Sequence, residues 1–172
     1  MIRSFQGKTP KVHPTAWVSE TAYVIGDVEI GEYSSVWPGT VIRGDTIKIT
    51  LGKFVDIQDN CVIHADSDAH YGDYVTLGHG VTCHAKTISS NCLIGNGATI
   101  NDGVVLGEYS IVASGSVVLE RKEFPAKSFV VGVPASAREE PTGDRHHQMI
   151  RRTAESYARK AQLFKAEGLG ST

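Results

Sequence analysis

The sequence predicts an all-β protein: a parallel β-helix of about six coils, followed by a C-terminal α-helix that packs on its outside. Three observations predict this architecture. Aliphatic residues recur every six positions, small residues form a second series at a fixed offset from the first, and the C-terminal segment changes to a helical period. The 172 residues suit one domain with enough chain to bury a core.

The aliphatic series runs from Val12 to Val118, with interruptions at 44–48 and 65–70 and one later step of five residues. An amphipathic α-helix would show a period of about 3.6 residues, and a half-buried strand a period of about two. A six-residue period suits short strands joined by tight corners, with three hexads in each triangular coil. Coils stacked at the strand spacing of about 4.8 Å would bury the aliphatic residues in one continuous core.

A second series of small residues supports the same period. It stands four positions after each aliphatic residue: Ala16, Ala22, Val28, Ser34, Thr40, Val55, Cys61, Val75, Val81, Cys92, Ala98, Val104, Ser110 and Ser116. Over about residues 10–120 the combined pattern resembles the hexapeptide repeat of the left-handed parallel β-helix proteins. The left hand is what this resemblance implies, since the general rule for parallel crossovers predicts the right hand.

The end of the repeat is predicted from two dipeptides, Phe124-Pro125 and Val133-Pro134, which break the pattern. We therefore assign residues 1–137 to the β-helix. Residues 138–172 are assigned to a linker and a C-terminal helix that belong to the same domain.

The C-terminal helix is predicted over about 144–167, where apolar residues follow the spacing of one helical face. These residues are Ile150, Ala154, Tyr157, Ala161 and Phe164. Such a stripe is expected to pack on the outside of the β-helix. Trp17 and Trp37 each stand one residue from an inward position, so they are expected at this contact or at a subunit interface.

Composition narrows the functional classes. The net charge of −2 gives no reason to expect a nucleic-acid partner. No apolar run approaches the roughly 20 residues that span a membrane, and no secretory signal precedes the repeat. Three cysteines without a disulfide-type spacing favour a reducing compartment, so a cytoplasmic location is expected.

Three histidines within the repeat are the candidate functional residues. His64 directly follows the inward residue Ile63, and His84 directly follows Cys83, three hexads later. These two histidines are therefore expected one coil apart on the same column. His79 stands at the second position of its hexad, on another column, so it cannot reach the same point within its own chain.

Other polar residues fall on the same two columns. One column carries Arg43, His64, His84 and Asn101, and the other carries Gln58, Asp59, His79 and Asn96. The columns meet only where one chain faces a neighbour, which a triangular prism achieves around a threefold axis. The sequence thus predicts a homotrimer with sites between subunits. Three neutral imidazoles form a complete protein ligand set for a catalytic zinc, with one position left open.

These motifs resemble those of the γ-class carbonic anhydrases and their close relatives. The motifs are Arg43-Gly44-Asp45, Gln58-Asp59-Asn60, His64 and Gly78-His79-x4-His84. The resemblance implies that His64, His79 and His84 are metal ligands, two from one subunit and one from the next. The metal would be Zn²⁺, with Fe²⁺ also compatible with three imidazoles. The implied reaction is reversible hydration of carbon dioxide to bicarbonate by a metal-bound hydroxide.

The resemblance also implies roles for the surrounding side chains. Arg43 with Asp45 and Asp59 would form ion pairs around the site and interface. Gln58 would hydrogen-bond solvent on the metal, and Tyr157 matches a tyrosine of the pocket. Asn101 stands where relatives often have an apolar residue, which makes this pocket more polar.

The chain departs from the family pattern in places. Thr46 replaces an acidic residue of the archetypal enzyme, Asp56 stands where asparagine is usual, and the loop at 65–70 is short. Asp66, Asp68 or His70 are then candidates for proton export. Two alternatives stay open: an acyl-CoA thioesterase or acyltransferase of the hexapeptide-repeat family, and a non-catalytic structural subunit.

Overall fold

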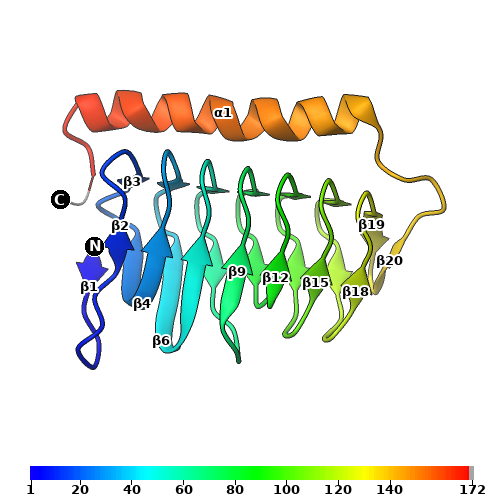
Figure 1. Cartoon of the computed structure of the whole chain (residues 1–172), viewed down its shortest axis with the longest axis horizontal. Helices are drawn as coiled ribbons and strands as arrows, with labels where there is room; N and C mark the ends of the chain where they lie inside the picture. Colours follow the sequence, from blue (N-terminus) through cyan, green and yellow to red (C-terminus); the bar gives the residue numbers. More distant parts are fainter. Residues whose placement is uncertain (171–172) are drawn as a thin grey trace.

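The computed structural model describes residues 1–170 and shows a left-handed parallel β-helix with one helix along its side (Figure 1). The elements are β1 (Ile2–Arg3), β2 (Lys11–Val12), β3 (Trp17–Val18), β4 (Tyr23–Ile30), β5 (Ser35–Val36), β6 (Val41–Leu51), β7 (Asp56–Ile57), β8 (Val62–Ile63), β9 (Ala69–Tyr71), β10 (Thr76–Leu77), β11 (Thr82–Cys83), β12 (Thr87–Ile88), β13 (Leu93–Ile94), β14 (Thr99–Ile100), β15 (Val105–Leu106), β16 (Ile111–Val112), β17 (Val117–Val118), β18 (Glu123–Phe124), β19 (Phe129–Gly132), β20 (Ala135–Ala137) and α1 (Asp144–Ala166). No helix in the described part of the chain has the length and apolar character needed to cross a membrane.

The strands stack into three faces. The first face contains β8, β11, β14 and β17, and the second contains β9, β12, β15 and β18, while β6 runs across both. The third face contains β3, β5, β7, β10, β13, β16 and β19, all parallel. These seven stacked strands give about seven coils.

The β-helix is therefore one coil longer than the sequence predicted. Phe124 pairs with Leu106, and Val130 pairs with Val112, so the six-residue period continues past Val118. Pro125 directly follows β18 and lies outside the strand ladder, where its missing N–H removes no ladder hydrogen bond. The Phe124-Pro125 dipeptide was wrongly interpreted as an end of the repeat.

The core consists of the two predicted series. Its largest fully buried side chains are Tyr71, Ile42, Ile49, Leu51, Ile57, Ile63, Leu77, Ile88, Ile94, Ile100 and Leu106, and nearly all of them belong to the bulky series. The small series fills the space between them, with Ala22, Val55, Cys61 and Val81 fully buried. The alternation of large and small residues fills the narrow interior.

Helix α1 returns from the last coil to the first along the third face (Figure 1). It buries Ile150, Ala154, Ala158 and Ala161. At its C-terminal end Phe164 contacts Trp17 and Trp37 edge to face, with ring centroids 5.3 Å apart in both pairs. The two tryptophans therefore serve the packing of this helix.

The last strand reverses direction. β20 pairs antiparallel with β19, from Val130 opposite Ala137 to Gly132 opposite Ala135.

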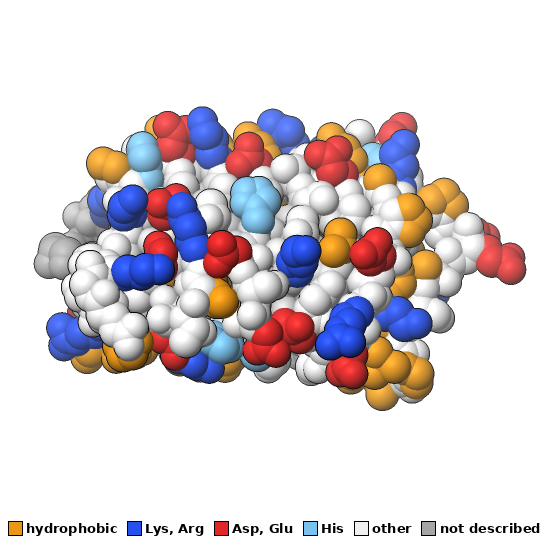
Figure 2. Space-filling view, turned by 60° about the horizontal axis from the view of Figure 1, so that its bottom comes forward, with side chains coloured by type: hydrophobic (Ala, Val, Ile, Leu, Met, Phe, Trp, Pro, Cys, Tyr) orange, Lys and Arg blue, Asp and Glu red, His pale blue; other side chains and the backbone are white. Residues whose placement is uncertain are grey.

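The view in Figure 2 shows side chains of both charge signs interspersed on one face, with histidines among them, in keeping with the small net charge.

Candidate metal centre

His64 and His84 lie side by side on the first face. They directly follow β8 and β11, which pair in parallel with Ile63 opposite Cys83. The centroids of the two imidazole rings are 5.2 Å apart. The predicted one-coil separation of these two residues is confirmed by this register.

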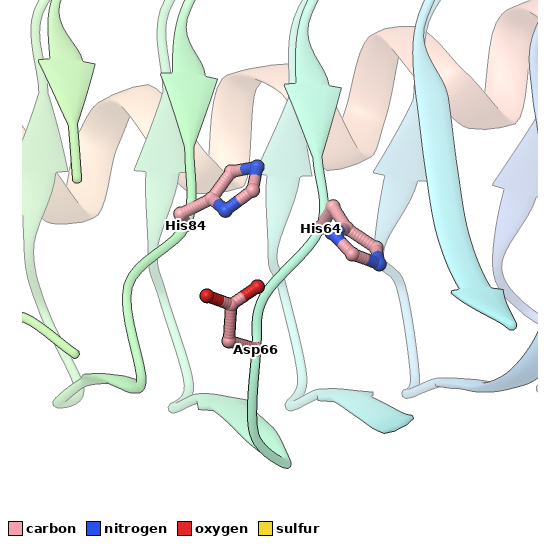
Figure 3. A group of neighbouring side chains, drawn as sticks. All are labelled: His64, Asp66 and His84. Atoms are coloured by element: carbon pink, nitrogen blue, oxygen red, sulfur yellow. The ribbon is translucent and has the colours of Figure 1, made fainter. Parts of the chain in front are cut away.

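A carboxylate joins the two imidazoles. Asp66 lies on the loop that follows β8, and its side chain stands between His64 and His84 (Figure 3). One ligand atom from each of the three residues lies within 4.8 Å of the other two. The six-residue repeat cannot predict that Asp66 approaches the two histidines, because Asp66 lies on a loop that interrupts the repeat. The acidic residues of that loop are the only feature of the sequence that points to such a contact.

Asp45 fixes the ring of His64 from the preceding coil. Its Oδ1 lies 3.1 Å from His64 Nε2, and the guanidinium of Arg43 donates to its Oδ2. The hydrogen bond from Arg43 holds the pKa of Asp45 below its usual value, and the contact with His64 adds to this effect. Asp45 is therefore a carboxylate that orients an imidazole, an arrangement typical of histidines that bind metals.

His79 lies on the third face, after β10. Its Nδ1 is 2.9 Å from Asp59 Oδ2, and Tyr157 Oη lies 3.5 Å from its Nε2. The backbone N–H of His79 donates to Asn96 Oδ1 at 3.1 Å. A Cβ on Gly78 would stand 2.3 Å from that oxygen, so glycine is required for this contact.

The structure thus gives two separate histidine groups within one chain. His64 and His84 share the first face with Asp66, while His79 belongs to the third face and pairs with Asp59. As expected, Arg43 contacts Asp45 in the same chain.

Gln58 is buried and directly follows β7, a strand that helix α1 contacts. Its side chain is 5% exposed, and its Nε2 donates to Asp56 Oδ2 at 2.9 Å. Ser35 Oγ lies 3.5 Å from Asp56 Oδ1 and accepts a 2.9 Å hydrogen bond from Trp37 Nε1. Burial raises the pKa of Asp56 to about 8. Sequence reasoning noted Asp56 only as a departure from the family, because nothing in the repeat shows that the helix covers it.

The remaining two predicted site residues, Asn101 and Tyr157, each contact a neighbouring part of the β-helix. Asn101 follows β14, and its Nδ2 donates to the carbonyl of Val118 on the next coil at 2.7 Å. Tyr157 comes from α1, where burial, followed by the nearby Asp56 and Asp59, raises its pKa.

The donor chemistry suits a divalent cation. His64 and His79 each use one ring nitrogen to contact a carboxylate, so a metal would bind the other nitrogen, which in His79 is Nε2, 3.5 Å from Tyr157 Oη. Imidazole and carboxylate donors suit zinc and ferrous iron alike.

The chain is similar to known proteins along most of its length. Residues 86–120 match the family described as bacterial transferase hexapeptide (six repeats). The chain is 37% identical over 168 residues to a carbonic anhydrase of Geobacillus kaustophilus, covering 96% of this chain and 92% of the relative. It is 36% identical to the mitochondrial gamma carbonic anhydrase 2 of Arabidopsis thaliana, covering 93% of this chain but spanning only 60% of that relative's length.

A solved structure supports the fold over nearly the whole chain. A hexapeptide transferase family protein from Anaplasma phagocytophilum superposes with a TM-score of 0.91 at 32% identity, covering 95% of this chain and 98% of that protein.

Proposed function

The chain belongs to the γ-class carbonic anhydrase family of hexapeptide-repeat proteins, and on that premise we propose that it is a metal-dependent enzyme that hydrates carbon dioxide reversibly to bicarbonate. The observation that carries this proposal is the pairing of His64 with His84 beside Asp66, together with His79 and its own carboxylate on another face. Each half holds one imidazole, His64 or His79, that already contacts an orienting carboxylate, as is typical of metal sites.

We propose that the functional form is a homotrimer with its sites between subunits. His79 belongs to a different face from His64 and His84, so a second copy must supply it. The side chain of His79 is 49% exposed and that of Asp59 is 36% exposed, which leaves both accessible to a neighbour. A threefold arrangement repeats this contact in a closed ring.

The metal would be held by His64 and His84 of one subunit and by His79 of the next, and we expect Zn²⁺, with Fe²⁺ the alternative. Such an ion acts as a Lewis acid and lowers the pKa of water in contact with it towards about 7. Asp45 and Asp59 keep their imidazoles in the required tautomer by accepting a hydrogen bond from one ring nitrogen. Arg43 keeps Asp45 ionised for that purpose.

The other polar residues are proposed to orient the reactants. Gln58 is held by Asp56 and can present one end of its amide to the pocket, while Asn101 and Tyr157 add further hydrogen-bonding groups near the ligands. Asp66 lies near both imidazoles, with one ligand atom within 4.8 Å of each, and is proposed to accept the proton released by hydration. Asp68, farther along the same loop, and His70, in the following strand β9, would pass it to buffer.

A second function is favoured by a groove along α1. This groove has a volume of about 680 Å³, is lined by Arg145 and Arg152, and reaches Tyr157, which contacts His79. Two guanidinium groups leading to the site suit a long anionic substrate, as an acyl-CoA thioester would be. The matched transferase structure has the same fold. The alternative is therefore a thioesterase or acyltransferase.

One preparation tests both functions. We would measure metal content, carbon dioxide hydration by stopped flow, and hydrolysis of acetyl-CoA on the same sample. Hydration that depends on the metal supports the proposal. Thioester hydrolysis without hydration supports the alternative. A trimer with bound metal and neither activity would contradict both and favour a structural subunit.

A further inference from the structure

Asp56 is a carboxyl group buried between the β-helix and α1. It is 1% exposed and lies on the outer side of β7, where it pairs with Ser35 of β5 and Thr76 of β10 in the strand ladder. Helix α1 covers this strip with small and apolar residues, including Ala154 and Ala158. A lone buried carboxylate is costly in such surroundings, so the position calls for an explanation beyond packing.

The contacts of Asp56 differ between its two oxygens. Ser35 Oγ accepts from Trp37 Nε1, so its own proton is free to point at Asp56 Oδ1. Asp56 Oδ2 faces the amide of Gln58. A serine hydroxyl that turned away would lose its buried partner, whereas an amide can offer either a donor or an acceptor by rotating about its last bond. Protonation is therefore expected at Oδ2, the oxygen that faces Gln58.

We propose that Asp56 is a positioning residue whose protonation state selects which end of the Gln58 amide faces the pocket beside His79. Only the effect of this rotation on catalysis rests on the proposed function; the rotation itself does not. With Asp56 ionised, Oδ2 accepts from Gln58 Nε2, as in the structure, and the carbonyl Oε1 points away from Asp56. With Asp56 protonated, its O–H must meet an acceptor, so the amide rotates and Nε2 turns away instead.

The location of Gln58 connects this rotation to the site. Its backbone N–H donates to the carbonyl of Leu77 at 2.9 Å, two residues before His79. The next residue, Asp59, contacts His79 directly. Gln58 is thus the direct chain neighbour of the carboxylate that contacts His79, and we infer that the free end of its amide lies on the His79 side. An acceptor there would orient a reacting water for attack, and a donor would instead bind an anionic product.

Several polar, charged or titratable groups face Asp56 and determine the pH at which it gains or loses its proton. Burial raises the pKa of Asp56 to about 8, and Gln58, Ser35 and, more weakly, Lys160 of α1 act in the opposite direction. Tyr157 of α1 and Cys61 also interact with it, and both have raised pKa values of their own, so they are neutral across the range of the switch.

The test follows both partners by NMR on the full chain, with and without metal. The carboxyl carbon of Asp56 and the side-chain nitrogen of Gln58, which is one of four glutamines, are monitored against pH. Both signals should move with one shared midpoint well above that of an ordinary aspartate. Ser35→Ala removes a contact that favours the ionised form, so both midpoints should shift upwards together. In Asp56→Asn the Gln58 signal should become independent of pH, and the matching step in the pH profile of hydration should disappear.

The matched control is Asp144→Asn, which removes an exposed carboxylate at the start of α1 and should change neither midpoint. An Asp56 midpoint near that of an ordinary aspartate, or a Gln58 signal that stays still while Asp56 titrates, would overturn the proposal. Because the NMR signals need neither metal nor substrate, failure of the proposed hydration activity would leave this result intact and readable.

Discussion

His79 Nδ1 lies 2.9 Å from Asp59 Oδ2, one coil below it on the third face of the β-helix. Asp45 engages His64 in the same way on the first face, at 3.1 Å. Two imidazoles on different faces thus each contact a carboxylate of their own. This duplication is what makes an intersubunit site the simplest interpretation.

The first prediction concerns the ligands. His64→Ala, His79→Ala and His84→Ala should each deplete the protein of metal, because two imidazoles do not complete the set. Metal content per subunit, measured by mass spectrometry, checks this. His70→Ala, which alters an exposed histidine outside the cluster, is the control and should keep its metal. Full metal content in His79→Ala would contradict an intersubunit site.

The second prediction is complementation. When His79→Ala and His84→Ala subunits are refolded together, one type supplies His64 and His84 and the other supplies His79. A mixed trimer arranged in a closed ring should then regain about one metal site. Differently tagged subunits allow the mixed species to be isolated and its metal measured. Absence of metal from isolated mixed trimers would show that all ligands come from one chain.

The third prediction concerns Arg43. Its ion pair with Asp45 is partly exposed in the subunit, with Arg43 48% and Asp45 21% accessible. Arg43→Ala should therefore cost the fold of one subunit less than about 1 kcal/mol. If the interface buries the pair, the cost to assembly should reach roughly 3–5 kcal/mol, because one charge is left uncompensated. Sedimentation over a dilution series separates the two effects. A variant that remains fully trimeric at high dilution would show that the pair lies outside the interface.

The fourth prediction is a pH dependence of stability. Burial raises the pKa of Asp56 from 3.8 to about 8. Since the folded state holds this proton more tightly than the unfolded chain, its stabilising contribution is complete below about pH 4 and is lost as the pH rises through 8. Asp56→Asn cannot ionise, so its free energy of unfolding should exceed that of the parent in alkaline buffer, by about 1.4 kcal/mol for each unit of pKa difference that is realised.

Denaturant unfolding at acidic, neutral and alkaline pH measures this effect. Asp144→Asn, at an exposed position, controls for the loss of one charge. Parallel curves for Asp56→Asn and the parent over the whole range would mean that Asp56 is ionised at little cost in the folded protein.

The fifth prediction concerns proton export. Asp66 is the carboxylate that lies near both His64 and His84, and Thr46 offers no second carboxylate directly after Asp45. Turnover of carbon dioxide should rise with added imidazole buffer, and Asp66→Asn should make that dependence stronger without reducing metal content. A high turnover that is indifferent to buffer in both proteins would refute this role.

Sequence reasoning succeeded where the six-residue period alone decides the geometry. The period places Ile57 opposite Leu77 and Ile63 opposite Cys83, and both registers are observed. The same register predicts the positions of residues at a fixed offset from these pairs, including His64 and His84.

It failed where geometry depends on contacts outside the repeat. The last coil was missed because Pro125 resembles a terminator, although proline at a corner removes no ladder hydrogen bond. The approach of Asp66 depends on the conformation of an interrupting loop. The burial of Asp56 depends on where α1 packs on the β-helix. The apolar stripe predicts which face of α1 is buried, but not which part of the β-helix that face covers.

The reversal at β20 has a consequence for self-association. In the last coil of a parallel β-helix, the outer edge of each strand can expose backbone N–H and C=O groups. Strands of another chain can pair with such an edge, as they do in fibrils. Here β20 occupies the outer side of β19 in the antiparallel direction, from Val130 to Gly132. An incoming chain would find that backbone already paired and running the wrong way for continued stacking. The hairpin thus closes the edge of the third face to further strands, whereas the other two faces end in β17 and β18.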